Sequence, residues 1–584
     1  MKKILMLIAA AVALVSCNMD FYRSDTMTSS MLKENPGAAV YTTDGNYSMF
    51  YQHLDYADGM YGGYTYSRIL FLMTELRGDN VALSGRTTDP LYEDNVYGDN
   101  PQTLDLQYFW FASYKIIYGA NSNIESIPVG VDVATDHLLG ENYFIRAIAH
   151  LNLCNVFATP YTYGKEIRRD MPGVVLRNST DCSVTKRATV GEVYDQIVLD
   201  LQKAMELMKA GTRRGNAGYA SYDAAAGLLT RVYLYMGEYE KCYQLAEEIM
   251  GGNPASKLDD ITTYYPNTRT SKETLWCIAK DNDDEGADYS PKSQLASMYY
   301  SNDAIGGTGW CEMYWSDPLM ELIFRHPEDK RLTYWGTLDA TNDGKKMVHW
   351  PIIDEANNFR NNANVHGVTL GTDPENLATL KFDGNNYTLK SKVVNGYTQY
   401  YITGMYTDAQ DNDGFEGGTR VYVRDNVGIA KGVRQTFPAY TMSKFSYQDG
   451  DPMLSSPAVI RWAEVILNAA EAYAHKGNEA KALEYTNVIR TRAGIPTWAD
   501  MAACNAEGYQ DVVDVVLDER RMELCFEGHR AIDVFRNGKV LDRRFAGVHA
   551  WEELDKAQMD ERFPYCIPFA EISVSGIEGN GKQK

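Results

Sequence analysis

The sequence predicts a mostly α-helical protein in which a scaffold of helix pairs carries a long insertion of irregular loops and short strands. Helical periodicity is strong from about residue 40 to 250 and returns from 457 to 538, whereas Gly, Asn, Asp and Thr dominate the stretch between. The chain has 584 residues, 45% of them apolar and 23% charged, so it can build the large core that such a scaffold needs. We expect one composite domain, with helical regions at 36–250 and 457–584 and the insertion at 251–456.

An export signal precedes the scaffold. Two lysines are followed by an apolar run over residues 4–14 that is too short to span a bilayer, so residues 1–16 are typical of a signal peptide. The sequence Leu-Val-Ser-Cys that ends at Cys17 resembles a bacterial lipobox, in which the cysteine becomes the lipidated N-terminus. We therefore expect a tether over residues 17–35 and attachment to the membrane through that lipid alone. Ordinary signal cleavage with an incidental Cys17 is the alternative.

The first helical region has three signatures of amphipathic helices. Residues that suit one helix face recur at three- and four-residue steps over 110–124, and a second such stretch covers 141–157. Thr189 and Glu192 have the spacing of a capping box, so a third helix should begin there.

Two helix–turn–helix segments have the spacing of tetratricopeptide repeats. The first spans residues 222–250 with Gly237 in its turn, and the second, far downstream, has Gly477 at the equivalent place. Glycine suits such a turn because it tolerates backbone conformations that other residues avoid. Two separated copies do not form a solenoid, but they favour a scaffold of antiparallel helix pairs.

Charges of opposite sign alternate at helical spacing from Asp518 to Arg536. A mixed cluster of Glu, His, Arg and Asp of this kind can belong to an active site. The interpretation we favour is a salt-bridged helix that ends at Gly528 and leads into a second helix.

The insertion contains short β-like runs at 397–405 and 419–423, and one glycine-rich segment in which aromatic residues gather without periodicity. That segment carries Tyr299, Tyr300, Trp310, Tyr314 and Trp315. A pyranose stacks its C–H faces on such rings while nearby polar side chains orient its hydroxyls, so we expect a sugar-binding surface. The alternative is that the rings pin the irregular segment onto the helices.

Composition restricts the partners of the chain. A formal charge of −22 makes nucleic acid and anionic lipid unsuitable, because phosphate binding needs clustered Lys and Arg. It also favours neutral glycans over sulfated or uronic ones, unless a local arginine patch overrules the net charge. The 42 Tyr residues outnumber the 18 Phe, which is typical of a protein that presents aromatic surface to a partner.

Motifs for catalysis and cofactor binding are missing from the sequence: it has no H-E-x-x-H, no G-x-S-x-G, no phosphate-binding loop and no Rossmann glycines. A glycoside hydrolase needs only two carboxylates across a cleft, which sequence spacing does not reveal, so hydrolysis stays an alternative to binding. We expect no cofactor. Acidic turns at 281–286 and 411–414 leave an irregular calcium site as the alternative, although neither completes an EF-hand loop.

A series of short motifs runs along nearly the whole mature chain. After the lipobox come W-x3-Y-x2-I-x2-A-N from Trp110 and E-x4-R-A from Glu141, and further motifs cover 459–496. The most diagnostic stretch, E-R-R-x-E-L-x-F-E-G-H-R-x-x-D, begins at Glu519, and Y-C-I-P-x-x-E-I follows from Tyr565. In this order the motifs resemble the SusD/RagB family of outer-membrane lipoproteins of the Bacteroidetes.

The resemblance implies a SusD-like α–α superhelix that binds oligosaccharides, or peptides in one branch, without catalysis. It also implies a surface-exposed outer-membrane lipoprotein that acts as a lid on a SusC-like TonB-dependent transporter. By position, it implies ligand contacts in a loop over residues 84–102 and in the central segment 299–315. The candidate binding residues are Asp79, Tyr92, Tyr97, Tyr299, Tyr300, Trp310, Tyr314 and Trp315.

We therefore predict a glycan-binding lipoprotein that delivers oligosaccharides to such a transporter and is not an enzyme. Peptide binding is the nearest alternative. A glycoside hydrolase and a purely structural repeat scaffold are the alternatives from other classes.

Overall fold

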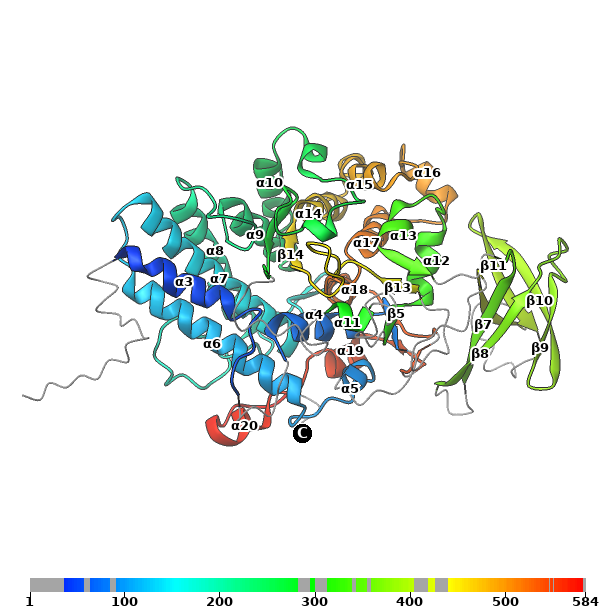
Figure 1. Ribbon diagram of the computed structural model, residues 1–584, viewed down its shortest axis with the longest axis horizontal. Coiled ribbons are helices and arrows are strands. Elements are labelled where there is room, and N and C mark those ends of the chain that lie inside the picture. Colours follow the sequence, from blue (N-terminus) through cyan, green and yellow to red (C-terminus); the bar gives the residue numbers. More distant parts are fainter. Residues whose placement is uncertain are drawn as a thin grey trace, which may run out of the picture.

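The computed structural model describes residues 36–56, 64–83, 91–281, 295–299, 312–338, 343–353, 359–403, 418–425, 440–545, 547–549 and 551–580, and the structural statements below concern these residues. Helices form the body of the molecule, as the sequence predicts (Figure 1). Within the described ranges, no helix has the length and apolar character of a membrane span.

The first helices form a layer at one end of the molecule (Figure 1). The helices that pack side by side there are α3 (Ala39–Ser48), α6 (Leu104–Ser126), α7 (Val133–Phe157) and α8 (Val190–Met208). The predicted helices at 110–124 and 141–157 lie in α6 and α7, which extend beyond them. The predicted capping box of α8 is confirmed, because the Thr189 side chain accepts from the N–H of Glu192 and the Glu192 carboxylate accepts from the N–H of Thr189.

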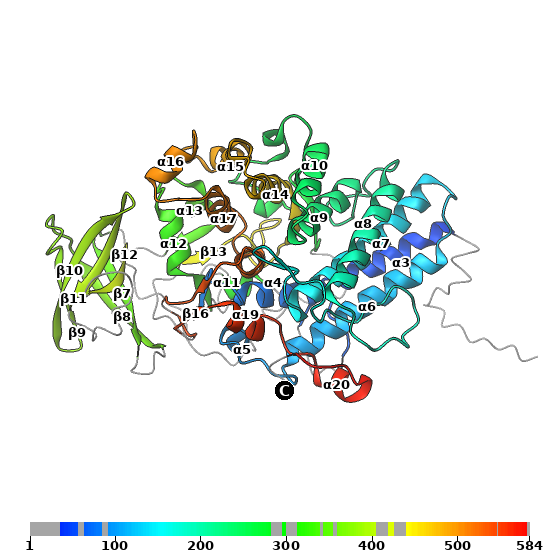
Figure 2. The ribbon, with the colours of Figure 1, turned by 180° about the vertical axis from the view of Figure 1, so that it is seen from behind.

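The two segments with repeat-like spacing form helix pairs that pack against each other (Figures 1 and 2). The pairs are α9 (Tyr222–Tyr235) with α10 (Tyr239–Met250), and α14 (Trp462–His475) with α15 (Glu479–Ala493). The Tyr239 ring stacks on His475 with 4.3 Å between ring centroids. Gly237 (φ 74°) and Gly477 (φ 72°) take the left-handed conformation in the two turns, so the prediction of helix pairs is confirmed.

The remaining elements of the helical body are shorter. The helices are α4 (Tyr66–Leu76), α5 (Leu91–Asn95), α11 (Ala296–Tyr299), α12 (Asp317–Phe324), α13 (Lys330–Tyr334), α16 (Met501–Ala506), α17 (Val512–Glu523), α18 (Arg530–Arg536), α19 (Lys556–Arg562) and α20 (Phe569–Ser575), with 3-10 turns η1 (Pro36–Ala38), η2 (Pro254–Lys257) and η3 (Tyr265–Asn267). The two-stranded antiparallel ladders of the described chain pair β1 (Val81–Leu83) with β5 (Met313–Trp315), β2 (Thr162–Tyr163) with β3 (Glu166–Ile167), β4 (Thr274–Cys277) with β14 (Ala458–Arg461), β6 (Gly336–Leu338) with β13 (Tyr440–Met442), and β15 (Leu541–Asp542) with β16 (Glu553–Leu554).

The charged stretch forms two helices, α17 and α18, as the sequence predicts. α17 ends at Glu523 rather than at Gly528, because the chain turns through positive φ at Phe526 (68°) and Gly528 (78°). The stretch is salt-bridged, but Glu523 and Glu527 pair with Arg461, a residue distant in sequence, rather than with neighbours on their own helix. Arg461 Nη1 donates to Glu523 Oε1 at 2.6 Å, and its Nη2 donates to Glu527 Oε1 at 2.8 Å. The segment is therefore a charged core that joins the end of β14 to α17 and the turn after it.

The insertion contains a six-stranded antiparallel sheet, which lies at one end of the long axis of the molecule (Figures 1 and 2). The strand order is β8-β7-β12-β11-β10-β9. The strands are β7 (Lys346–Ile353), β8 (Phe359–Val368), β9 (Ala378–Phe382), β10 (Asn385–Val394), β11 (Tyr397–Thr403) and β12 (Gly418–Asp425).

The sequence predicts irregular loops and short strands here, but not that six strands form one sheet. The two β-like runs of the sequence lie in β11 and β12, but they belong to a larger unit with its own core. Trp350, Leu389, Ile402 and Val421 are buried in that core, separately from the helical one. Only alternate strand residues face it, so the apolar pattern is sparse and is masked in the sequence by Gly-, Asn- and Asp-rich turns.

Candidate functional site

One ladder brings together the two segments that the resemblance assigns to ligand binding. β1 follows α4 and pairs with β5, and Leu83 lies opposite Met313 at the end of the ladder. Residues 84–90 continue from Leu83, and residues 300–311 lead toward β5; both segments lie outside the described residues. The described strand residues nearest these two segments, Leu83 and Met313, are therefore neighbours.

Three of the candidate rings lie in the protein core. Tyr299, Tyr314 and Trp315 are buried. The ring centroid of Phe526 is 5.5 Å from that of Tyr299 and 5.4 Å from that of Trp315. As placed, these rings offer no face to a ligand. They pin the central segment to the helical body, which is the alternative that the sequence left open.

The other aromatic candidates are less enclosed. Tyr92 and Tyr97 are half-buried, and Tyr97 donates its hydroxyl hydrogen to the carbonyl oxygen of Arg77 at 2.9 Å. Tyr300 and Trp310 fall outside the described residues. A contribution of these four residues to binding stays a prediction.

Asp79 is buried and ion-paired. Its carboxylate accepts from Arg530 Nε at 2.6 Å and lies 3.2 Å from Arg521 Nη2. Burial alone would raise its pKa, but the two guanidinium groups outweigh burial and hold the pKa of Asp79 at about 2. Its contacts are those of a framework residue.

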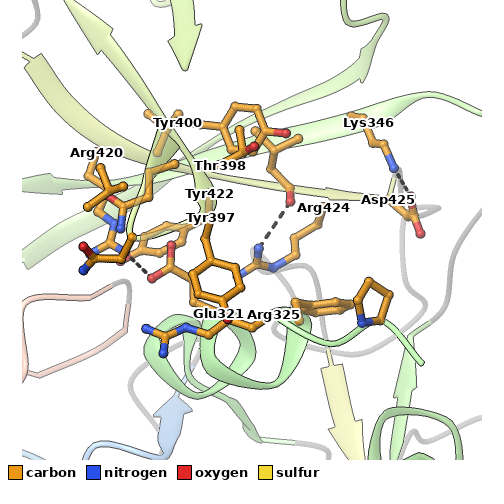
Figure 3. Close-up of a pocket in the computed structure, with 17 residues that line it drawn as sticks. Glu321, Arg325, Lys346, Tyr397, Thr398, Tyr400, Arg420, Tyr422, Arg424 and Asp425 are labelled. Atoms are coloured by element: carbon orange, nitrogen blue, oxygen red, sulfur yellow. Dashed lines mark hydrogen bonds and ion pairs between the residues drawn. The ribbon is translucent and has the colours of Figure 1, made fainter. Parts of the chain in front are cut away.

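A cavity of about 480 Å³ lies between α12 and the six-stranded sheet (Figure 3). On the helical side, the cavity is lined by the C-terminal part of α12 and the residues that follow it. Its volume is typical of small-molecule sites. The described wall holds aromatic rings (Phe324, Tyr397, Tyr400 and Tyr422), cations (Arg325, Lys346, Arg420 and Arg424) and acids (Glu321 and Asp425).

Strand alternation decides which side chains of β12 face this cavity. Val421 and Val423 pack on the core of the sheet, so Arg420, Tyr422 and Arg424 point the other way, toward α12 (Figure 3). The β-like run at 419–423 predicts the strand but not its polar face. The alternation of Arg, Tyr and Arg with valines was the signal that could have revealed it.

Both acids in the described wall of the cavity are engaged by cations. Arg420 pairs with Glu321, and Lys346 Nζ lies 2.5 Å from Asp425 Oδ1 (Figure 3). Neither carboxylate is therefore available as an isolated charge.

Arg325 is held by aromatic residues instead. Its Nη1 donates to the Tyr509 hydroxyl at 3.2 Å, and its guanidinium carbon lies 4.9 Å from the centre of the Tyr397 ring. No described carboxylate comes within 4.0 Å of its nitrogens. Tyr397 in turn donates its hydroxyl hydrogen to Glu507, outside the cavity wall.

A buried polar pair connects α12 to the sheet behind the cavity. His349 Nε2 lies 2.9 Å from Asp317 Oδ1, and Arg424 Nη2 lies 3.4 Å from the same oxygen. Burial raises the pKa of Asp317 to about 7, with Arg424 opposing the shift. Burial and the charge of Arg424 lower the pKa of His349 to about 3. The two walls of the cavity are thus joined by a buried polar contact.

Metal binding finds no support in the described part of the chain. No group of three or more His, Cys, Asp or Glu side chains there is suited to hold an ion. Asp281, which opens the first acidic turn, pairs with Arg269 at 2.5 Å. The rest of that turn and the turn at 411–414 lie outside the described residues.

Comparisons with known proteins agree on one family. The model of the SusD family matches residues 247–563, and a model described as "Starch-binding associating with outer membrane" matches residues 60–234. SusD-like protein P25 of Formosa agariphila is 21% identical over 447 residues, which cover 76% of this chain and 72% of the relative.

Solved structures share the fold. A SusD superfamily protein from Bacteroides thetaiotaomicron VPI-5482 has a TM-score of 0.62 at 22% identity, with 93% of this chain and 99% of that one covered. A structure named as a laminarin binding SusD-like protein has a TM-score of 0.57 at 18% identity and covers 93% of this chain and 99% of its own.

Proposed function

The chain belongs to the SusD family, and from this premise we propose that it binds an oligosaccharide without cleaving it. One family model is described as starch-binding, and one structural relative is named for laminarin binding. Both names concern carbohydrate, which favours a glycan over a peptide as the ligand of this chain.

The cavity between α12 and the sheet is the observation that carries the proposal. The half-buried Tyr397 supplies a ring face on which a sugar can stack, and Arg325 and Gln399 supply hydrogen-bond donors for its oxygens. The pairing of β1 with β5 supports further contacts from Tyr92 and Trp310.

Binding without cleavage is supported by the ion pairing of the two carboxylates in the cavity wall. Glycoside hydrolysis uses two carboxyl groups that face the scissile bond, one of which gives up or takes a proton. Glu321 and Asp425 are both ion-paired in the described wall. We propose that they orient the cations of the site and take no part in chemistry.

Delivery to a transporter completes the proposal. The predicted lipid on Cys17 would tether the protein to the outer membrane, and one family model is described as associating with that membrane. A receptor that releases its ligand into a SusC-like TonB-dependent transporter needs only modest affinity, in the micromolar to millimolar range (about −8 to −4 kcal/mol).

The test uses the purified protein from residue 18 onward. It is titrated in a calorimeter with a panel of oligosaccharides and a panel of short peptides, and the mixtures are then analysed by chromatography. We expect binding to at least one sugar and no new product. Sugar cleavage, binding of peptides alone, or silence toward both panels would each contradict the proposal, in favour of a hydrolase, a peptide receptor or a scaffold respectively.

A further inference from the structure

The local charge of the cavity between α12 and the sheet is opposite to the net charge of the protein. The chain carries a formal charge of −22. The described cavity wall nevertheless has four cationic and two acidic side chains. Because a charged group acts mainly within a Debye length of about 8 Å at physiological salt, a ligand in the cavity responds to this wall more than to the distant surface.

We propose that the cavity selects an anionic oligosaccharide, and that a carboxylate or sulfate group of the sugar binds Arg325. This inference rests on the proposed function, since it names the class of glycan for the same site. The net charge of the protein suggests a preference for neutral glycans. The local arginine patch of the cavity overrules that preference in this proposal.

Arg325 is the cation best suited to this role. Lys346 and Arg420 are already neutralised by the two acids of the wall. Arg424 is buried and shares the oxygen of Asp317 behind the wall. Arg325 is half-exposed and has no described carboxylate within 4.0 Å.

The guanidinium of Arg325 is also held in place before a ligand arrives. Tyr509 accepts from its Nη1 and donates its own hydroxyl hydrogen to Asp518, while the Tyr397 ring lies against the guanidinium. A planar guanidinium with several N–H donors matches the paired oxygens of a carboxylate or sulfate. Stacking on Tyr397 keeps the group oriented and reduces the entropy that a flexible side chain would lose on binding.

The acidic residues near Arg325 but outside the cavity wall do not pair with its guanidinium. Glu507 accepts from the Tyr397 hydroxyl and lies 3.9 Å from His326 Nε2, and Asp518 accepts from Tyr509. Each is engaged with a residue that supports Arg325 from behind. An anion that enters from the cavity therefore meets the guanidinium first.

The experiment compares sugars that differ only in charge. A galacturonic acid oligosaccharide is titrated beside its neutral methyl ester, and a sulfated galactan oligosaccharide beside its desulfated form, at low and high salt. We expect at least one anionic sugar to bind about tenfold tighter than its neutral partner, with a preference that shrinks at high salt. The two pairs show whether the carboxylate or the sulfate is the recognised group.

Matched variants assign the preference to Arg325. Arg325→Gln should reduce the ratio of anionic to neutral affinity about tenfold, whereas Lys381→Gln removes the same charge from the exposed surface of β9 and should leave the ratio unchanged. Circular dichroism and the melting temperature establish that both variants fold. Equal or tighter binding of the neutral partners, or an equal loss in both variants, would overturn the inference and leave the proposed function intact. Absence of binding to every sugar, including a broad neutral panel, would overturn the proposed function itself.

Discussion

Arg530 Nε donates to the buried Asp79 Oδ1 across 2.6 Å, and this ion pair ties the turn after α4 to the first residue of α18. Arg521 adds a second contact to the same carboxylate. Asp79 was a ligand-binding candidate in the sequence, yet both of these partners belong to the diagnostic charged stretch of the helical body. The geometry supports a structural role for Asp79.

Asp79→Asn should therefore destabilise the fold. The substitution leaves the partly buried guanidinium groups of Arg521 and Arg530 without their counter-charge, which should cost up to about 3–5 kcal/mol in the free energy of unfolding. Urea denaturation of the purified protein measures this loss. Asp542→Asn is the matched control, because Asp542 pairs with Arg544 at the surface and should contribute less than about 1 kcal/mol. A stable Asp79→Asn protein with weakened sugar binding would instead restore Asp79 to the ligand site.

Low pH should reduce the free energy of unfolding because buried glutamates become protonated. Burial alone would raise the pKa of Glu523, but Arg492, Arg461 and Arg331 outweigh burial and hold the pKa at about 2. Because the folded pKa lies below the ordinary value near 4.5, the stabilisation is present above pH 4.5 and is lost as the pH falls from about 4.5 to 2. Thermal unfolding across that window measures the loss, which should be roughly 3 kcal/mol for this group.

Glu523→Gln separates this group from the other acids of the protein. The variant should be less stable at pH 7, where it lacks the ion pairs, and its stability should fall less steeply than that of the wild type below pH 4.5. Parallel pH profiles for the two proteins would show that Glu523 does not titrate in this window.

Much of the helical fold could be predicted from the sequence because its signals are local. The capping box at Thr189 and the glycines at 237 and 477 specify helix starts and turns through neighbouring residues alone. The six-stranded sheet was missed as a unit because its order depends on pairing between distant strands. Nothing in the local sequence around Tyr422, for example, indicates that it will lie opposite His349.

The candidate site was less accessible to sequence reasoning than the fold. A glycine-rich segment with many rings suggests exposed aromatics, but the pairing of β1 with β5 places Trp315 inside the core. The charged and aromatic wall of the cavity combines α12 with β11 and β12, three elements whose contact is set by tertiary structure. The β-like runs at 397–405 and 419–423 predict the two strands, but local periodicity predicts neither α12 nor its contact with them.

Trp315→Ala should lower the stability of the fold, and not only the affinity for sugar. The ring is buried against Phe526, and removal of a large core side chain typically costs about 3–5 kcal/mol. The melting temperature should fall by several degrees. Trp310→Ala is the comparison, since the sequence predicts that this ring contacts sugar, and it should weaken binding at unchanged melting temperature. An unchanged melting temperature for Trp315→Ala would contradict its assignment to the core.

Tyr397→Ala should reduce oligosaccharide affinity about tenfold or more, a loss of about 1.4 kcal/mol or greater. The ring lines the cavity and supports Arg325 from 4.9 Å, so its removal takes away a stacking face and loosens the cation beside it. Tyr397→Phe keeps the ring and loses only the hydrogen bond to Glu507, so it should retain most of the affinity. Tyr41→Ala removes a ring that is 72% exposed on α3 and should bind as the wild type does. Calorimetric titration of the four proteins with one sugar gives the comparison. Full affinity in Tyr397→Ala would show that sugar binds elsewhere, and the segments on either side of the β1–β5 ladder would then be the next place to mutate.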